Sequence, residues 1–191
     1  MHGAKPLAGK KIAIMVASGF IEEHMTDVQK SLIAAGAQST IVSPEVGVAN
    51  GWHEGGWGHN FFVDEKISDV LPSQYDLLLA AGGARSTMTL AANAHSRRVL
   101  KGMLEAGKPV ALTDDATTLL VDAEIASGRT VAAPEAVSEK LMGAGATIAE
   151  GNVAVDGNLI TMSATEGMAA FITAVKASLG VEAEVVANEA A

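Results

Sequence analysis

Short runs of apolar residues recur along the chain and alternate with stretches whose apolar residues lie three or four positions apart. Residues 12–17 (IAIMVA) form the first run. A continuous apolar run is typical of a parallel strand that is covered on both faces. The next stretch, roughly residues 22–35, has the spacing of a helix with one buried face and stops at Gly36, and glycine commonly ends helices. The pattern therefore predicts a strand followed by a helix.

The same alternation continues along the rest of the chain. Further strands are predicted at residues 39–43, 75–81, 109–113, 128–133, 152–155 and 159–163. Further helices are predicted at residues 93–106, 115–126, 135–144 and 166–178. The last two strands are joined by Asp-Gly-Asn at residues 156–158, which indicates a hairpin. Residues 44–60 show neither pattern and are rich in glycine, so a loop is predicted there.

Strands that alternate with helices through short loops indicate an α/β fold of the flavodoxin-like, doubly wound type, with helices on both faces of a mostly parallel sheet. A length of 191 residues fits one such domain. We expect a single domain over residues 11–179, preceded by an N-terminal tail at residues 1–10. Residues 180–191 are rich in alanine and glutamate and lack a core pattern, so a disordered acidic tail is expected.

Charge and composition narrow the class of function. The formal net charge is −9 and no run of Lys and Arg interrupts it, which argues against binding to nucleic acid or to an anionic membrane surface. No apolar stretch is long enough to span a bilayer, and the first residues lack the apolar core of a signal peptide. A cytoplasmic location is therefore expected. The chain contains no cysteine, which excludes disulfides and every thiol-based mechanism.

In an open α/β sheet, ligands bind beyond the carboxyl ends of the strands, where the strand order reverses. Three groups of residues directly follow predicted strands and should meet in one crevice. They are Ser18, Gly19, Glu22, Glu23 and His24; Gly82, Gly83, Ala84 and Arg85; and Thr113, Asp114, Asp115 and Ala116.

Four segments, in the same order and spacing, resemble the ThiJ/PfpI superfamily, which has a class I glutamine-amidotransferase-like fold. They are residues 75–83 (YDLLLAAGG), residues 107–111 (GKPVA) followed by Leu119-Leu120, residues 128–129 (GR) and residues 155–161 (VDGNLIT). The resemblance extends from about Lys10 to Val175. It implies a nucleophile elbow at Asp114 and self-association into a homodimer or a larger homo-oligomer.

The resemblance also implies three substitutions at the site. The family usually places a cysteine and a histidine at the elbow and a glutamate after the first strand. These positions fall on Asp114, Asp115 and His24. Because all three residues differ, the family's cysteine-dependent protease, deglycase and glyoxalase activities are not expected. The cysteine-free version of the fold is also similar to the C-terminal domain of large-subunit catalases.

Two interpretations are open for the elbow. Asp114 is either a nucleophile or general base paired with His24, or a cap for the helix that begins at Asp115. The backbone N–H groups of Gly82 and Gly83 either form an oxyanion hole or belong to a strand-to-helix turn that needs glycine.

Other candidate residues concern the pocket and its rim. Glu23 and Arg85 are candidates for the pocket or for a subunit interface, and Arg85 would bind an anionic group. The segment of residues 52–59 contains Trp52, His53 and His59, and we expect it to cover the crevice or pack at an interface. Its spacing of histidines matches no established zinc pattern, so neither a metal nor a cofactor is predicted.

Two functions are consistent with these observations. The first is a pseudoenzyme: a non-thiol, non-catalytic or ligand-binding member of the superfamily, with a stress-related role implied by the resemblance, which binds a small molecule at most. It predicts that backbone N–H groups hold Asp114 and that the crevice is small. The alternative is a hydrolase- or hydratase-like enzyme that uses Asp114 with His24. It predicts a hydrogen bond between these two residues and an open pocket at the elbow.

Overall fold

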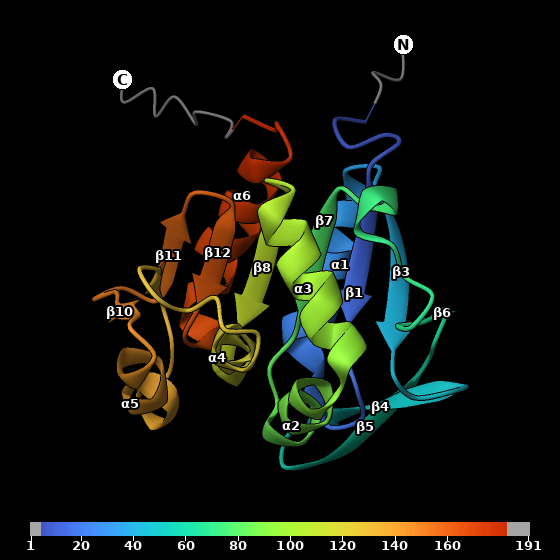
Figure 1. Ribbon diagram of the computed structural model, residues 1–191. Coiled ribbons are helices and arrows are strands. Elements are labelled where there is room, and N and C mark those ends of the chain that lie inside the picture. Colours follow the sequence, from blue (N-terminus) through green and yellow to red (C-terminus); the bar gives the residue numbers. More distant parts are fainter. Residues whose placement is uncertain (1–4, 183–191) are drawn as a thin grey trace.

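The computed structural model describes residues 5–182 and has the predicted α/β architecture (Figure 1). The strands are β1 Lys11–Met15, β2 Phe20–Ile21, β3 Gln38–Ser43, β4 Val48–His53, β5 Gly56–Phe62, β6 Glu65–Lys66, β7 Leu77–Ala80, β8 Val110–Thr113, β9 Thr130–Val131, β10 Thr147–Ile148, β11 Val153–Asp156 and β12 Leu159–Met162. The helices are α1 Glu22–Ala34, α2 Ala84–Ala92, α3 Ala94–Glu105, α4 Leu119–Asp122, α5 Glu135–Gly143 and α6 Met168–Ser178, with short 3-10 turns η1 Pro72–Gln74, η2 Asp114–Thr118 and η3 Thr165–Gly167.

The central sheet has seven strands in the order β11-β12-β8-β7-β1-β3-β6. All neighbouring pairs are parallel except β11 with β12, which form the hairpin that the Asp-Gly-Asn turn predicts. The chain continues from β1 to β3 on one side, whereas β7 and β8 lie on the other side of β1. The order of the strands therefore reverses between β1 and β7, which is where ligands bind in sheets of this kind.

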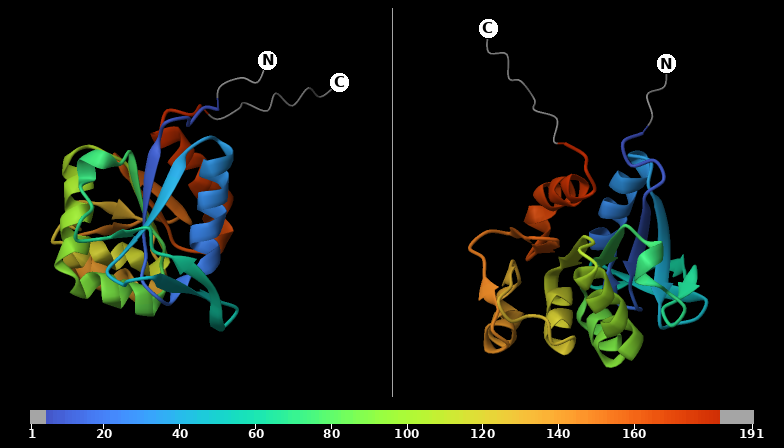
Figure 2. Two further views of the ribbon diagram at one scale, coloured as in Figure 1. Left: turned by 90° about the vertical axis from the view of Figure 1, so that its right-hand side faces the viewer. Right: turned by 45° about the horizontal axis from the view of Figure 1, so that its top comes forward.

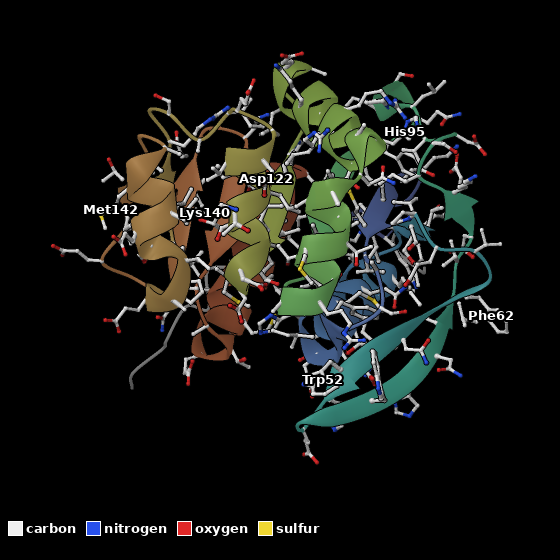
Figure 3. The ribbon with its side chains drawn as sticks, turned by 60° about the horizontal axis from the view of Figure 1, so that its bottom comes forward. Trp52, Phe62, His95, Asp122, Lys140 and Met142 are labelled. Atoms are coloured by element: carbon white, nitrogen blue, oxygen red, sulfur yellow. The ribbon has the colours of Figure 1, made fainter. Side chains whose placement is uncertain are left out.

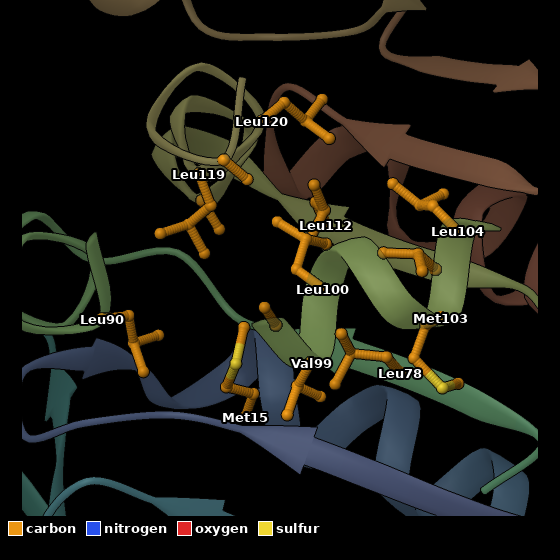
Figure 4. Close-up of a cluster of buried hydrophobic side chains, with 14 of the residues drawn as sticks. Met15, Leu78, Leu90, Val99, Leu100, Met103, Leu104, Leu112, Leu119 and Leu120 are labelled. Atoms are coloured by element: carbon orange, nitrogen blue, oxygen red, sulfur yellow. The ribbon is translucent and has the colours of Figure 1, made fainter. Parts of the chain in front are cut away.

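The sheet separates two layers of buried apolar side chains, which explains the continuous apolar runs. Ala13 and Met15 of β1 face the layer that contains α3 and α4, whereas Ile12 and Ile14 face the layer that contains α1 and α6. Figure 2 shows α1 and α3 on opposite sides of the sheet. Figure 4 shows part of the first layer, where α3 packs over Met15 and neighbouring strands. Since side chains alternate along a strand, both faces of β1 are covered.

The prediction of a loop at residues 44–60 is wrong, because β4 and β5 form an antiparallel hairpin there. Together with β2 they make a separate sheet of three strands, which extends from one end of the molecule (Figure 2). Two of the glycines that suggested a loop are required by packing. A Cβ atom on Gly51 or Gly58 would collide with the carboxylate of Glu22.

The short strands β2, β6 and β10 have no predicted counterpart, and two helices also differ from the prediction. Helix α2 follows β7 directly and is not apparent from the sequence pattern, because its buried residues include Ser86 and Thr87. The helix predicted at residues 115–126 is shorter and begins with the 3-10 turn η2. In η2 the hydroxyl groups of Thr117 and Thr118 donate to carbonyl groups three residues earlier.

The segment that precedes β1 contributes to the core, since Leu7 is fully buried. Most of the predicted acidic tail, residues 183–191, lies outside the described residues. Within residues 5–182, no helix has the length and apolar character needed to cross a membrane.

Candidate functional site

A cavity of about 390 Å³ opens at the reversal point of the sheet. It is lined by Gly19, Ile21, Trp52, Gly83, Ala84 and Arg85. Gly19 follows β1 and Gly83 follows β7, so two of the three predicted groups of residues reach this cavity. The third wall is the β4–β5 hairpin, which contributes Trp52 (Figure 3). Asp114 is not one of the lining residues.

Asp114 has the strained backbone expected of an elbow. Its φ angle is +52°, a left-handed conformation that aspartate tolerates better than most residues. The turn after β7 passes so close that a Cβ atom on Gly82 would lie 2.7 Å from the Cβ of Asp114 and 2.6 Å from the carbonyl oxygen of Thr113. Position 82 therefore requires glycine, because any side chain there would collide with these atoms. Asp114 starts η2 and Thr113 is the preceding N-cap residue, so Asp114 is not itself the cap.

The carboxyl group of Asp114 is half-buried. Burial raises its pKa, the neighbouring charge of Asp115 raises it further, and a hydrogen bond from the backbone N–H of Asp115 partly offsets the increase. Among residues 5–182, no other side chain forms a hydrogen bond with this carboxyl group. It is consequently a weaker acid than an ordinary aspartate, and it is less firmly held than its neighbour Asp115.

Asp115 fixes the turn that follows β7. Its Oδ1 atom accepts hydrogen bonds from the backbone N–H of Gly83 at 2.7 Å and from the hydroxyl of Thr87 at 3.1 Å. Gly83 has a φ angle of +124°, and a Cβ atom there would collide with the backbone of residues 19–21. The N–H of Gly83 is thus used within the protein. It is not free for an oxyanion unless Asp115 moves.

His24 lies in a buried network of hydroxyl groups. Its Nδ1 atom is 3.1 Å from the Oγ1 of Thr113, and its Nε2 atom is 3.1 Å from the Oγ1 of Thr165. Thr113 Oγ1 also accepts the backbone N–H of Gly82 at 2.9 Å. One arrangement uses every donor: Gly82 donates to Thr113, the hydroxyl of Thr113 donates to Nδ1, and Nε2–H donates to Thr165. Burial lowers the pKa of His24, although nearby carboxylates act in the opposite direction, so the neutral ring suits this network.

The hairpin is attached to the first turn of α1 by two carboxylate–histidine pairs. Glu22 is buried and accepts the backbone N–H of His59 at 2.9 Å, and its other oxygen lies 2.5 Å from the Nδ1 of His59. Burial alone would raise the pKa of Glu22, but these hydrogen bonds outweigh it and lower the pKa. Glu23 pairs with His53, and this hydrogen bond raises the pKa of His53. These pairs position the strand that carries Trp52.

Among the described residues, Arg85 is the one charged residue that lines the cavity. Its guanidinium lies over the ring of Trp57, at 5.2 Å from the ring centroid. Trp57 in turn meets Trp52 edge to face, with ring centroids 5.4 Å apart. The aliphatic stem of Arg85 runs along Gly19, where an added Cβ atom would lie 2.8 Å from the Cβ of Arg85. Both ends of the arginine side chain are thereby supported.

The structure brings some predicted site residues together and separates others. Arg85 and Trp52 share the cavity, whereas Glu23, His53 and His59 serve to attach the hairpin. Within residues 5–182, no hydrogen bond joins His24 to Asp114, because the threonine hydroxyls occupy both ring nitrogens. The sequence analysis placed Thr113 in the crevice without assigning it this contact, and it missed Thr165. In the same part of the chain, no group of three His, Asp or Glu side chains could hold a metal ion.

The sequence resembles those of known proteins over most of its length. The DJ-1/PfpI family matches residues 10–177. The chain is 28% identical over 197 residues to Protein DJ-1 homolog D of Arabidopsis thaliana, covering 94% of this chain and 50% of that relative. It is 27% identical over 151 residues to a deglycase, TK1284, of Thermococcus kodakarensis, covering 79% of this chain and 88% of the relative.

Solved structures show the same fold. A two-domain protein of Anabaena variabilis, with DJ-1/ThiJ/PfpI-like and ferritin-like domains, superposes with a TM-score of 0.86 at 23% identity. The superposition covers 94% of this chain and 52% of that protein. The chain thus spans about half the length of this protein and of the Arabidopsis relative.

Proposed function

Because the chain belongs to the DJ-1/PfpI family and contains no cysteine, we propose that it is a non-catalytic member that binds a small molecule in the cavity beside Gly83. The catalytic chemistry of a thiol is unavailable at Asp114. The cavity at the reversal point of the sheet is larger than the small crevice that this interpretation predicts, but Asp114 does not line it. Its volume of about 390 Å³ lies within the usual range of about 300–1,000 Å³ for small-molecule sites.

The observation that carries this proposal is that polar groups around the elbow are already hydrogen-bonded within the protein. The N–H of Gly83 is bonded to Asp115, the N–H of Gly82 to Thr113, and both nitrogens of His24 to threonine hydroxyls. An oxyanion hole needs donors that point at the reacting atom and are free to bind it. These groups instead satisfy one another, whereas the cavity next to them remains open.

A paired measurement of turnover and binding tests the proposal. Wild type and Asp114→Ala are assayed with a panel of esters and of α-oxoaldehydes, and Asp122→Ala on α4 is the matched control (Figure 3). We expect turnover at background level in all three proteins. Binding is followed by tryptophan fluorescence with a library of small compounds. Because Trp52 and Trp57 are the chain's two tryptophans, a change in fluorescence reports on this region.

Two results would contradict the proposal. Turnover in the wild type and the Asp122 variant that disappears in Asp114→Ala would show a catalytic role for the elbow. A library in which no compound alters the fluorescence or raises the melting temperature would leave the cavity without a ligand.

A second candidate function is acid–base catalysis by Asp114 without a thiol. Its support is the raised pKa of a half-buried carboxyl group in a strained elbow, a combination found at functional sites. His24 is not part of this version, because its ring nitrogens are engaged elsewhere. The discriminating measurement is a pH–rate profile for any substrate of the panel. An activity that follows the ionisation of Asp114 and is abolished in Asp114→Asn would establish it.

A further inference from the structure

The lining of the cavity is apolar except for one cation. Ile21, Ala84 and Trp52 provide the side-chain surface, Gly19 and Gly83 provide backbone, and Arg85 provides the charge. Within residues 5–182 no carboxylate lines the cavity, although the whole chain carries a formal net charge of −9. We propose that the ligand of this cavity is a small organic carboxylate with a flat apolar body. This inference rests on the proposed function and specifies the chemical class of the ligand.

The guanidinium of Arg85 has its donors available. Across residues 5–182, neither an ion pair nor a hydrogen bond engages this group, and its defined partner is the ring of Trp57. A guanidinium presents a planar set of N–H donors that matches the two oxygens of a carboxylate. The guanidinium carbon lies 5.2 Å from the centroid of the Trp57 ring, a cation–π contact that occupies no N–H donor. Within residues 5–182, Arg85 can therefore bind an anion without giving up another hydrogen bond.

The pair of Trp52 and Trp57 indicates the chemical character expected for the rest of the ligand. Trp52 lines the cavity, and the residue is 40% exposed although it contacts Trp57. Its edge-to-face contact with Trp57 holds the ring at a defined angle. Three other lining residues, Gly19, Gly83 and Ala84, are small. We expect a flat apolar body to pack against Trp52 in this lining, and its burial would contribute most of the affinity.

A single cation also distinguishes between classes of anion. Phosphate groups carry more than one negative charge near pH 7 and are usually bound by several donors or cations. Here the N–H of Gly83 is already bonded to Asp115. Arg85 is the one cation among the lining residues within residues 5–182, and one guanidinium matches the charge and the two oxygens of one carboxylate.

A matched series of probes tests this inference by tryptophan fluorescence. The probes are 3-phenylpropionate, its neutral amide, the corresponding amine, and inorganic phosphate. We expect 3-phenylpropionate to bind the wild type at least about tenfold more tightly than the amide, since a charge-assisted pair is roughly twice as strong as a neutral one. The amine and inorganic phosphate should bind more weakly than the amide.

Variants at position 85 assign the selectivity to one side chain. In Arg85→Gln, affinity for the carboxylate should fall to that for the amide, while affinity for the amide stays within about twofold. Arg85→Lys should retain part of the preference, because it keeps the charge without the planar fork. Arg129→Gln, before β9, is the matched control and should behave as the wild type. Because Arg85 is exposed, these variants should fold, and circular dichroism verifies that they do.

The outcomes separate this inference from the function on which it rests. Equal affinities for carboxylate and amide in the wild type, or a preference that survives Arg85→Gln, would overturn the carboxylate assignment but leave a ligand-binding cavity. Tighter binding of inorganic phosphate than of 3-phenylpropionate would overturn it as well. If none of the four probes binds, the carboxylate assignment fails. The proposed function fails only if the wider library also gives no response.

Discussion

Asp115 holds the turn after β7 in place through two hydrogen bonds. Its Oδ1 atom accepts both the N–H of Gly83 at 2.7 Å and the hydroxyl of Thr87 at 3.1 Å. Gly83 and Thr87 are buried, with Thr87 only 5% exposed. Asp115→Ala removes the acceptor and leaves two buried donors without a partner. Asp115→Asn keeps a neutral acceptor of the same shape.

The magnitudes follow from these two hydrogen bonds. A hydrogen bond to a charged group contributes about 1.5–3 kcal/mol and a neutral one about 1 kcal/mol. Because the bond from Thr87 is long, we assign roughly 2 kcal/mol to the Gly83 contact and roughly 1 kcal/mol to the Thr87 contact. Asp115→Ala should therefore reduce the free energy of unfolding by about 3 kcal/mol, and Asp115→Asn by about 1 kcal/mol. For a chain of this length, the alanine variant should melt roughly 6–12 °C lower.

Urea unfolding at pH 7, with hydrogen exchange of the Gly83 amide, measures both consequences. The Gly83 amide should lose protection in the alanine variant and keep most of it in the asparagine variant. Equal stability of the two variants would show that the acceptor oxygen is unimportant. If both lie within about 0.5 kcal/mol of the wild type, which is the usual range for surface changes, then Asp115 does not hold the turn and the N–H of Gly83 is available after all.

Three further predictions concern buried or half-buried groups. Burial and Asp115 raise the pKa of Asp114, so this carboxyl group stabilises the fold below the unfolded pKa and loses that contribution as pH rises through the folded pKa. Asp114→Asn, which also tolerates the positive φ, should increase the free energy of unfolding at pH 7 but not at pH 3; an equal gain at both would contradict this. Because the pKa of His24 is lowered, the free energy of unfolding should decrease as the pH falls below the unfolded pKa of 6.5. Urea unfolding between pH 7.5 and 5.5 should show a smaller decrease in His24→Gln than in the wild type. Ser96 has a buried hydroxyl that lacks a hydrogen-bond partner within residues 5–182. Ser96→Ala should therefore increase the free energy of unfolding by about 1 kcal/mol. A lower melting temperature in this variant would argue that an ordered water binds the hydroxyl in the wild type.

Much of the fold could be predicted from the sequence, because the relevant signals are local. The apolar run before Ser18 predicts a strand covered on both faces, and Ile12 and Ala13 indeed face opposite layers of the core. The antiparallel β11–β12 hairpin follows from the Asp-Gly-Asn turn. Helix α2 could not be predicted in this way, because part of its buried face is polar: Ser86 accepts the backbone N–H of Ala17 at 2.9 Å.

The candidate site was harder to predict, because its contacts join residues distant in sequence. The sequence places His24 after the first strand but does not say where the ring points. Its partners are Thr113 and Thr165, which are 89 and 141 positions away. The register of the sheet and the position of η3 bring them together, and neither leaves a local pattern. The hairpin presents the same difficulty, since Gly51 is explained by Glu22, a residue of α1.

The polar groups at the elbow and at the rim of the cavity differ in how far the protein itself satisfies them. Buried donors and acceptors are nearly always paired, and an enzyme leaves some of them free so that the substrate can complete the set. At this elbow Asp115, Thr113 and Thr165 complete the set internally. These hydrogen bonds stabilise the empty site, and under the proposed function they leave few free groups to stabilise a transition state. Within residues 5–182 the guanidinium of Arg85 has no hydrogen-bond or ion-pair partner, so the proposed function assigns ligand recognition to the rim of the cavity rather than to Asp114.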